Sequence, residues 1–306
     1  MISGVTPANE RVQPERVTVR IVDGGMVAFA AWHALKGKVA WPLTFQVPRM
    51  LRRLLAEASD TWVVCWNGER LWKRELWPAY RDRPEIWDEA GREDFGAMLE
   101  VLTALGVVQY RTLRLEADEA LAALVHHLEG QEEIVIRSDD KDFMQLLSGS
   151  TWMEGRVRGT VHFRHVRELL GVGPAYVVDF LALAGDVADG IPRILPPTTA
   201  ISLIESRGHV RSWIDRELRI PDRTRRRIAA GRGQLKINLE LVDLSADAVR
   251  NRKAPGKPLL RGWGDLAAAR EIGERTGISW LQDEKLVDEY GAMLQIGERT
   301  RARLGV

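Results

Sequence analysis

Short apolar runs rich in β-branched residues alternate with helical patterns in the first half of the chain. The apolar runs are residues 17–23, 61–66, 107–112 and 133–137. The stretches between them with apolar residues at helical spacing are 44–58, 93–105 and 117–128. Strands that alternate with helices favour a mainly parallel sheet with helices on both faces. The pattern therefore predicts an α/β fold.

The pattern changes further along the chain. The stretch TWMEGRVRGTVHF, residues 151–163, predicts a β-hairpin with Glu154 and Gly155 near its turn. After Gly173 the strand signals stop, and helical patterns are interrupted only by loops rich in Pro and Gly, GIPRILPP and NRKAPGKPLLRGWG. We therefore expect a loose N-terminal leader over 1–16, an α/β domain over 17–172 and a helical region over 173–306.

Composition limits the class of protein. The 306 residues carry a net charge of +1, which excludes a uniformly basic coat for nucleic acid but not local basic patches. Cys65 is the only cysteine, so an intrachain disulfide is impossible and a reducing cytoplasm is the expected compartment. The sequence contains no signal peptide and no apolar run of transmembrane length, so no membrane partner is expected.

Acidic residues gather where the predicted strands end. In an open parallel sheet, the carboxyl ends of the strands form the ligand crevice, so acids that are distant in sequence would meet there. Asp23 ends the first strand, and Asp140 and Asp142 follow the fourth. The helix at 117–128 opens with Glu116, Asp118 and Glu119, and the loop GDVAD adds Asp186 and Asp189.

Two explanations compete for these acids. Each one alone is better explained as a solvated residue or a helix cap, and Ser138 or Asp139 could cap a helix that starts near Asp140. Four acidic segments on one predicted edge make that explanation weaker for the set, because the carboxylates would repel one another without cations. No His or Cys joins them, and an all-oxygen ligand set suits Mg²⁺ or Mn²⁺ rather than zinc.

Five motifs resemble, in order, those of the 5′-nuclease family, which includes phage flap endonucleases and the 5′-3′ exonuclease domain of bacterial DNA polymerase I. They are IVDGGMVAFAAWHAL, ELWPAYRDRP, LEADEALAAL, SDDKDFMQLL and DFLALAGDVADGIP. The similarity runs from about residue 18 to 200. It implies a PIN-like domain followed by a helical DNA-binding region of the helix-three-turn-helix kind.

The resemblance also implies an activity and its ligands. It implies a monomeric enzyme that hydrolyses phosphodiester bonds near the 5′ ends of flapped, nicked or branched DNA, with RNA 5′ ends left open. Two divalent cations about 4 Å apart would activate water and stabilise the leaving oxygen. Carried over by motif, the ligands of the first metal are Asp23, Glu116 and Asp118. Those of the second are Glu119, Asp140, Asp142, Asp186 and Asp189.

Two basic regions are the expected DNA contacts. In the family, residues corresponding to about 68–95 lead into a helical arch, where Arg81 and Arg83 would contact the scissile phosphate. Its mixture of aromatic and cationic residues, including Lys73, Arg74 and Tyr80, favours single-stranded nucleic acid, although the tryptophans there could simply be packed. Residues 205–236 hold ten basic and four acidic side chains, a local charge of +6. Their expected phosphate contacts are Arg223, Arg225, Arg226, Arg227, Arg232 and Lys236, and a solvated helix face is the alternative.

The sequence departs from the family at three points. Trp66 stands where the family has an aspartate after the second strand, beside the neutral Asn67. Pro196 and Pro197 replace a glycine-rich loop that grips duplex DNA, and Ala30 replaces an arginine. Two alternatives to a nuclease on DNA therefore remain: a branched-DNA-binding protein of the same fold with weak or lost hydrolysis, and a PIN-type ribonuclease.

Overall fold

The computed structural model describes residues 18–56, 61–68, 71–81, 87–111, 115–216, 221–252 and 264–304. The predicted leader over 1–16, the predicted catalytic residue Arg83 and part of the predicted arch lie outside the described residues.

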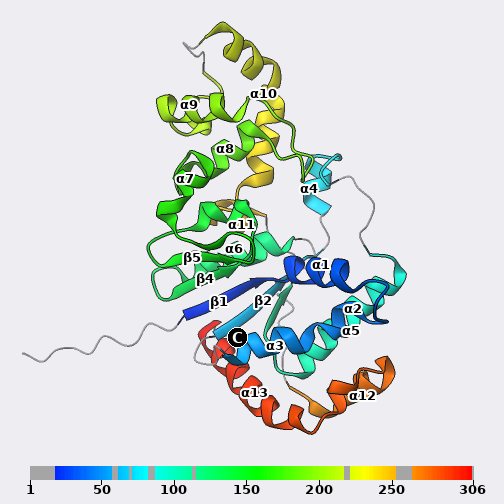
Figure 1. Ribbon diagram of the computed structural model, residues 1–306. Coiled ribbons are helices and arrows are strands. Elements are labelled where there is room, and N and C mark those ends of the chain that lie inside the picture. The colour runs from blue at the N-terminus through cyan, green and yellow to red at the C-terminus, as the bar shows by residue number, and fades with distance from the viewer. Residues whose placement is uncertain are drawn as a thin grey trace, which may run out of the picture.

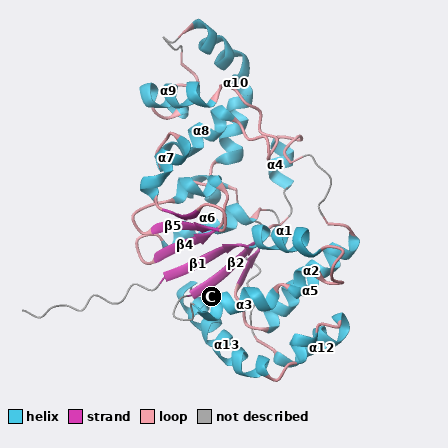
Figure 2. Cartoon of the chain, viewed as in Figure 1, coloured by secondary structure: helices cyan, strands magenta, loops and turns pink. Residues whose placement is uncertain are grey.

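A single six-stranded sheet forms the centre of the described chain (Figures 1 and 2). Its strands are β1 (Thr18–Asp23), β2 (Thr61–Trp66), β3 (Gln109–Arg111), β4 (Glu133–Arg137), β5 (Thr151–Gly155) and β6 (Gly159–Val161). They lie in the order β3-β2-β1-β4-β5-β6, with every pair parallel except β5 and β6. The predicted α/β fold with a mainly parallel sheet and a terminal hairpin is confirmed.

The central strands are apolar along most of their length because both faces of the sheet are covered. On one face, α6 (Ala117–Leu128) packs against the strands; α8 (Val177–Ala184) belongs to the same apolar core, and α9 (Pro197–Arg207) and α10 (Asp222–Val242) pack on α8. On the other face, α1 (Gly24–Leu35) and α13 (Lys285–Leu304) contact β2, and α2 (Pro42–Phe45), α3 (Val47–Ala56), α5 (Glu89–Ala104) and α12 (Leu266–Thr276) complete the second apolar core, with α12 packed on α5. Figure 1 shows α6 on one side of the strands and α3 and α13 on the other.

The helical half of the chain is used in two places. The segment α7 (Val166–Leu170) to α11 (Ala246–Asn251) extends from the β4 and β5 side of the sheet, whereas α13 returns to the opposite face at β2 and α12 packs on α5 (Figure 1). Pro196 and Pro197 start α9 as its N-cap and first helical residue, positions at which a missing N–H leaves no hydrogen bond unmade. The domain boundary at 172 remains a prediction. Among the described segments, none of the helices combines the length and apolar character that a membrane span requires.

The prediction for the residues after β4 needs correction. We expected Ser138 or Asp139 as the helix cap, with Asp139 the preferred one, but the Asp139 carboxylate accepts the backbone N–H groups of Arg156, Val157 and Arg158 in the β5–β6 turn, at 3.0 to 3.3 Å. Asp140 caps the following helix instead, and that helix is the 3₁₀ segment η1 (Lys141–Leu146). Three successive turn N–H groups point to one place, which gives Asp139 more hydrogen bonds than a single helix cap would.

Candidate active site

Asp23 is held where β1 passes into α1. As the N-cap of α1 it accepts a hydrogen bond from the backbone N–H of Met26 at 3.1 Å, and the Ser138 hydroxyl donates to its other oxygen at 2.9 Å. Burial raises the pKa of Asp23, and the charge of Asp140 raises it further. The two strand ends, β1 and β4, thus bring Asp23 and Asp140 into electrostatic contact, as the rule for parallel sheets predicted.

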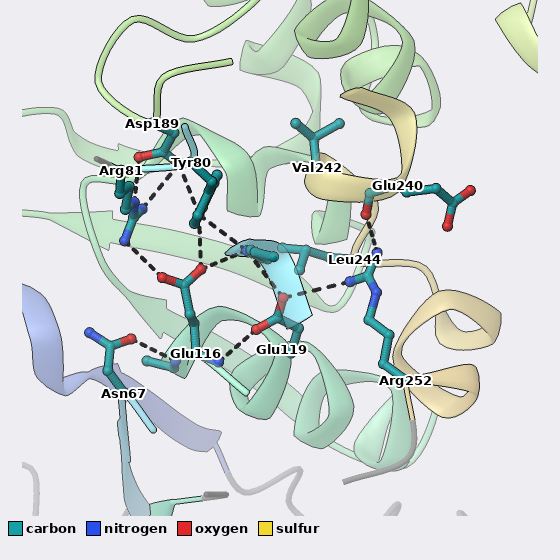
Figure 3. A network of polar contacts seen from close by, with 12 residues as sticks. Asn67, Tyr80, Arg81, Glu116, Glu119, Asp189, Glu240, Val242, Leu244 and Arg252 are labelled. Atoms are coloured by element: carbon teal, nitrogen blue, oxygen red, sulfur yellow. Dashed lines mark hydrogen bonds and ion pairs between the residues drawn. The ribbon is translucent and has the colours of Figure 1, made fainter. Parts of the chain in front are cut away.

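Glu116 and Glu119 form a capping box at the start of α6. The Glu119 carboxylate accepts the backbone N–H of Glu116 at 2.8 Å, and both side chains are fully buried. Glu116 in turn accepts hydrogen bonds from Lys73 at 2.7 Å, Tyr80 at 2.9 Å and Arg81 at 3.1 Å. Lys73 lies on α4 (Leu71–Leu76) and also pairs with Glu119 at 3.1 Å. Figure 3 shows this network.

Arg81 joins Glu116 to Asp189. Its Nε and Nη2 donate to the two oxygens of Asp189 at 2.6 and 3.1 Å, a bidentate pair. The Arg81 backbone N–H also donates to the Asp189 carbonyl at 3.0 Å. Its φ of 44° makes it the one residue other than glycine with positive φ in the described part of the chain. Since that conformation is unfavourable for a residue with a side chain, these contacts must hold it in place.

Three further acids, Asp118, Asp140 and Asp142, lie near one another at this edge and have raised pKa values. Burial raises the pKa of Asp118, chiefly with the help of Glu116, and burial also raises that of Asp142, with Asp140 and Asp189 adding to the shift. Asp140 couples to both Asp118 and Asp189, and burial raises its pKa as well. Acids from distant segments therefore lie close enough to raise one another's pKa values, and their role as metal ligands stays a prediction.

Asp186 lies at the margin of this group. It makes an ion pair with Lys141 of η1 and accepts the backbone N–H of Ala188 at 2.8 Å. Its charge also contributes to the raised pKa of Asp142. The backbone of Asp186 pairs with Ile191 in both directions, which closes the loop that carries Asp189 toward Arg81.

The carboxylate oxygens at this edge are of the kind that hard divalent cations prefer. In the described structure, however, several of these carboxylates pair with the side chains of Lys73 and Arg81. Within the described residues, no three His, Cys, Asp or Glu side chains are grouped to hold one metal ion. Arg81 and Lys73 instead bridge Glu116 with Asp189 and Glu119. Asp142 nevertheless buries an oxygen, Oδ1, that has no hydrogen-bond partner in the described structure. An unpartnered carboxylate oxygen among acids with raised pKa values is the environment that a bound cation would relieve.

Trp66 is a core residue. Its side chain is 1% exposed, its indole N–H donates to Gln109 at 2.8 Å, and its ring meets Phe95 edge-on with centroids 5.4 Å apart. It also fills the space beside Gly24, where an added Cβ would lie 2.3 Å from the indole. Asn67, the neighbouring candidate, accepts the backbone N–H of Ala117 at 2.8 Å and so supports the start of α6.

The predicted DNA contacts have two environments. Lys73 and Tyr80 are buried against Glu116, whereas Arg74 is exposed on α4. On α10, Arg223, Arg226 and Arg227 are exposed; Arg225 is also exposed and pairs with Asp222 at 2.5 Å. Arg232 is partly buried, and Lys236 pairs with Asp215 at 2.7 Å.

Sequence reasoning missed the residues that hold the acids. It treats Ser138 only as a cap, and it gives no role to Lys141, which lies within the motif SDDKDFMQLL. It treats Asn67 only as a weak metal ligand, although the contact of this side chain is with backbone. The one signal in the sequence was position. Ser138 and Asn67 directly follow a strand, and Lys141 lies between two predicted metal ligands, Asp140 and Asp142.

Comparison with known proteins identifies the family. Residues 18–170 match the model of the 5′-3′ exonuclease N-terminal resolvase-like domain. The thermostable DNA polymerase I of Thermus filiformis is 29% identical over 97% of this chain and 36% of its own length. DNA polymerase I of Rhizobium leguminosarum is 28% identical over 76% of the chain and 24% of its own length. The chain thus spans about a third or less of these curated relatives.

Solved structures agree on the fold. The flap endonuclease of bacteriophage T5, in a complex with DNA and metal ions, has a TM-score of 0.65 at 20% identity and covers 92% of this chain and 99% of its own. The catalytic core of Rad2 with a DNA substrate has a TM-score of 0.53 at 16% identity, covering 90% and 93%. This chain belongs to the family of the 5′-3′ exonuclease N-terminal resolvase-like domain.

Proposed function

We propose that this protein is a divalent-metal-dependent 5′ nuclease that hydrolyses phosphodiester bonds near the 5′ ends of flapped, nicked or branched DNA. The observation that carries the proposal is that acids from β1, α6, η1 and the 186–189 loop raise one another's pKa values at the carboxyl edge of the sheet, where Arg81 joins Glu116 to Asp189. The family match and the relatives that act on DNA support it.

Two divalent cations, Mg²⁺ or Mn²⁺, are the proposed cofactors. When bound they would supply an activated water and stabilise the leaving oxygen. Asp23, Glu116 and Asp118 would hold the first, and Asp140, Asp142, Asp186 and Asp189 would hold or hydrate the second. Glu119 is predicted for the second as well, but its described contacts run to the Glu116 backbone, Lys73 and Arg252. In the described structure, Glu119 therefore helps to hold Lys73 and the start of α6 in place.

The basic residues would bind and orient the DNA. Arg81 already lies among the acids, so its guanidinium can hold a phosphate at that edge once Asp189 engages a cation. The exposed arginines of α10 would contact the duplex backbone, which positions DNA without reading its bases. The RNA 5′ end remains an open second substrate, and a monomer suffices for every contact proposed.

The test is cleavage of a 5′-labelled flap by the pure protein. We expect products with Mg²⁺ or Mn²⁺ and none with EDTA, and a blunt duplex labelled at the same end should be cut more slowly. Tight flap binding without product in either metal would replace the proposal with that of a branched-DNA-binding protein. Cleavage of only the matched RNA substrate would favour a ribonuclease.

A further inference from the structure

The end of the DNA-binding helical segment is fastened to the acidic edge. The backbone of Val242, the last residue of α10, and of Leu244 just beyond it exchanges hydrogen bonds with the Gln145 amide at 3.0 and 2.8 Å. The His126 ring on α6 contacts the Leu244 carbonyl at 2.8 Å. The segment therefore cannot shift without disturbing η1 and α6, the two elements that carry Asp142 and Glu116.

Arg252 extends this attachment to α4. It follows α11, its Nη2 donates to the Glu240 carbonyl, and its guanidinium lies over the Trp72 ring at 4.3 Å from the centroid. Its Nη1 lies 3.7 Å from Glu119 Oε1, and the two side chains are 9% and 0% exposed. Figure 3 shows Arg252 reaching from the α10–α11 side toward Glu119. One side chain thus contacts three separate elements.

The contacts of Arg252 with Glu119 and with Trp72 both support α4, which lies at the base of the predicted arch. Glu119 Oε1 also pairs with Lys73 at 3.1 Å, and Lys73 donates to Glu116, which accepts from Arg81. Trp72 precedes Lys73 on α4, so the stacked guanidinium supports the same turn of helix. The atoms Arg252 Nη1 and Glu119 Oε1 are buried without hydrogen bonds, and a shift of about 0.5 Å would bring them into bonding range.

We propose that Arg252 is a positioning residue that couples the DNA-binding segment α10–α11 to α4, and so places Lys73 and Arg81 at the acidic edge. The proposal rests on the nuclease function proposed above. DNA that binds α10 would act on the arch base through this side chain, because the guanidinium is the described contact between residues 240–252 and Trp72. Arg252 itself touches neither substrate nor the reacting atoms.

The first test needs no catalysis. Hydrogen exchange of the α4 amides, residues 71–76, is compared in the wild type, Arg252→Gln and Arg250→Gln. Arg250 lies on α11, two residues before Arg252, and pairs with Asp247 at 3.2 Å with both side chains largely exposed, so its substitution changes the charge equally without touching α4. We expect α4 exchange to rise about tenfold in Arg252→Gln alone, in keeping with a lost buried cation–π contact. Unchanged α4 exchange would overturn the proposal.

The second test separates positioning from general stability. We expect Arg252→Gln to reduce the single-turnover cleavage rate of a 5′ flap about tenfold while its Kd for the same DNA in Ca²⁺ changes less than about twofold. Arg252→Lys keeps the charge near Glu119 but not the flat face on Trp72, so its rate should be intermediate. A parallel fall of melting temperature, affinity and rate would overturn the proposal in favour of a merely structural role. Absence of any wild-type cleavage would count against the nuclease function, whereas the exchange experiment would still judge Arg252.

Discussion

Two groups of cations in this molecule carry the same charge in opposite surroundings. Lys73 and Arg81 are enclosed at the carboxyl edge of the sheet, where carboxylates surround them. Burial alone would lower the pKa of Lys73, but Glu116 and Glu119 raise it well above its ordinary value. On α10, Arg226 and Arg227 extend into solvent.

The difference shows what each group can do. A buried ion pair in which one partner is removed leaves an uncompensated charge, so the enclosed cations and their acids depend on one another. Exposed charges are screened by salt and contribute little to stability, but they remain available to a polyanion. The enclosed group therefore sets the geometry of the edge, and under the proposed function the α10 group would set how strongly DNA is held.

The largest effect is expected from the acids of the enclosed region. Asp140→Asn combined with Asp142→Asn should abolish cleavage, because two anionic metal contacts are lost, while flap affinity stays equal or rises as repulsion of phosphate falls. The matched control is Asp215→Asn with Asp222→Asn, which removes the same charge beside exposed cations. Cleavage rates and Kd values of the two double variants decide it, and equal cleavage by both would contradict the proposed metal site.

Stability should separate the two groups of cations next. Lys73→Met removes the cation that Glu116 and Glu119 share and leaves Arg81 and Arg252 as their described cationic partners, so we expect a loss of about 3–5 kcal/mol in the free energy of unfolding. Arg226→Met, an exposed counterpart, should change it by less than about 0.5 kcal/mol. Urea unfolding of the two variants measures both values. Similar midpoints would mean that the enclosed network contributes no more than a surface charge.

DNA affinity should show the reverse dependence. Replacing Arg225, Arg226 and Arg227 with alanine should weaken binding to all duplex-containing substrates alike. If all three contact phosphates, the slope of log affinity against log salt should fall by about 2–3 units. The control removes three exposed arginines of α3 on the other side of the sheet, Arg49, Arg52 and Arg53. An unaltered slope in the α10 variant would leave that helix as a solvated face.

The smallest effect concerns the pH dependence of stability. Burial raises the pKa of Asp142 well above its ordinary 3.8, so in the absence of metal the ionised carboxylate destabilises the folded state. Asp142→Asn should therefore raise the melting temperature at pH 8, and the gain should disappear as the pH falls through the folded pKa toward 3.8. Thermal melts in EDTA across this range test the sign. A gain that grows toward acid pH would contradict it.

Local pattern was enough to predict the sheet, because fully buried strands must be apolar and their β-branched runs are hard to confuse with loops. The run Ile134–Ile136 became the centre of β4, and the hairpin formed with its turn at 156–158, beside the predicted Glu154 and Gly155. The return of α13 to the sheet was not predicted, because the apolar face of an amphipathic helix does not identify the surface on which it will pack.

The sequence predicted the part of the candidate site that depends on strand order alone. The carboxyl ends of parallel strands coincide, so the strand pattern alone places Asp23, Asp140 and Asp142 together. Their partners could not be placed in this way. Lys73 and Glu116 are 43 residues apart, and nothing in either local pattern shows that a lysine on α4 will be enclosed. Trp66 is a similar case, because its burial and its contacts with Gln109 and Phe95 place the indole in the core, and its local pattern does not.

The junction of α13 with β2 has a consequence for the order of folding. The Thr300 hydroxyl accepts the backbone N–H of Trp62, a hydrogen bond between residues 238 apart, at a point where the short β3 offers Trp62 no described partner. Closing so long a loop is slow, and strand pairing that depends on it is exposed to misassembly during synthesis. We expect chains stopped before α13 to leave β2 open to proteolysis, and limited digestion of such a chain, compared with the full one, would show it.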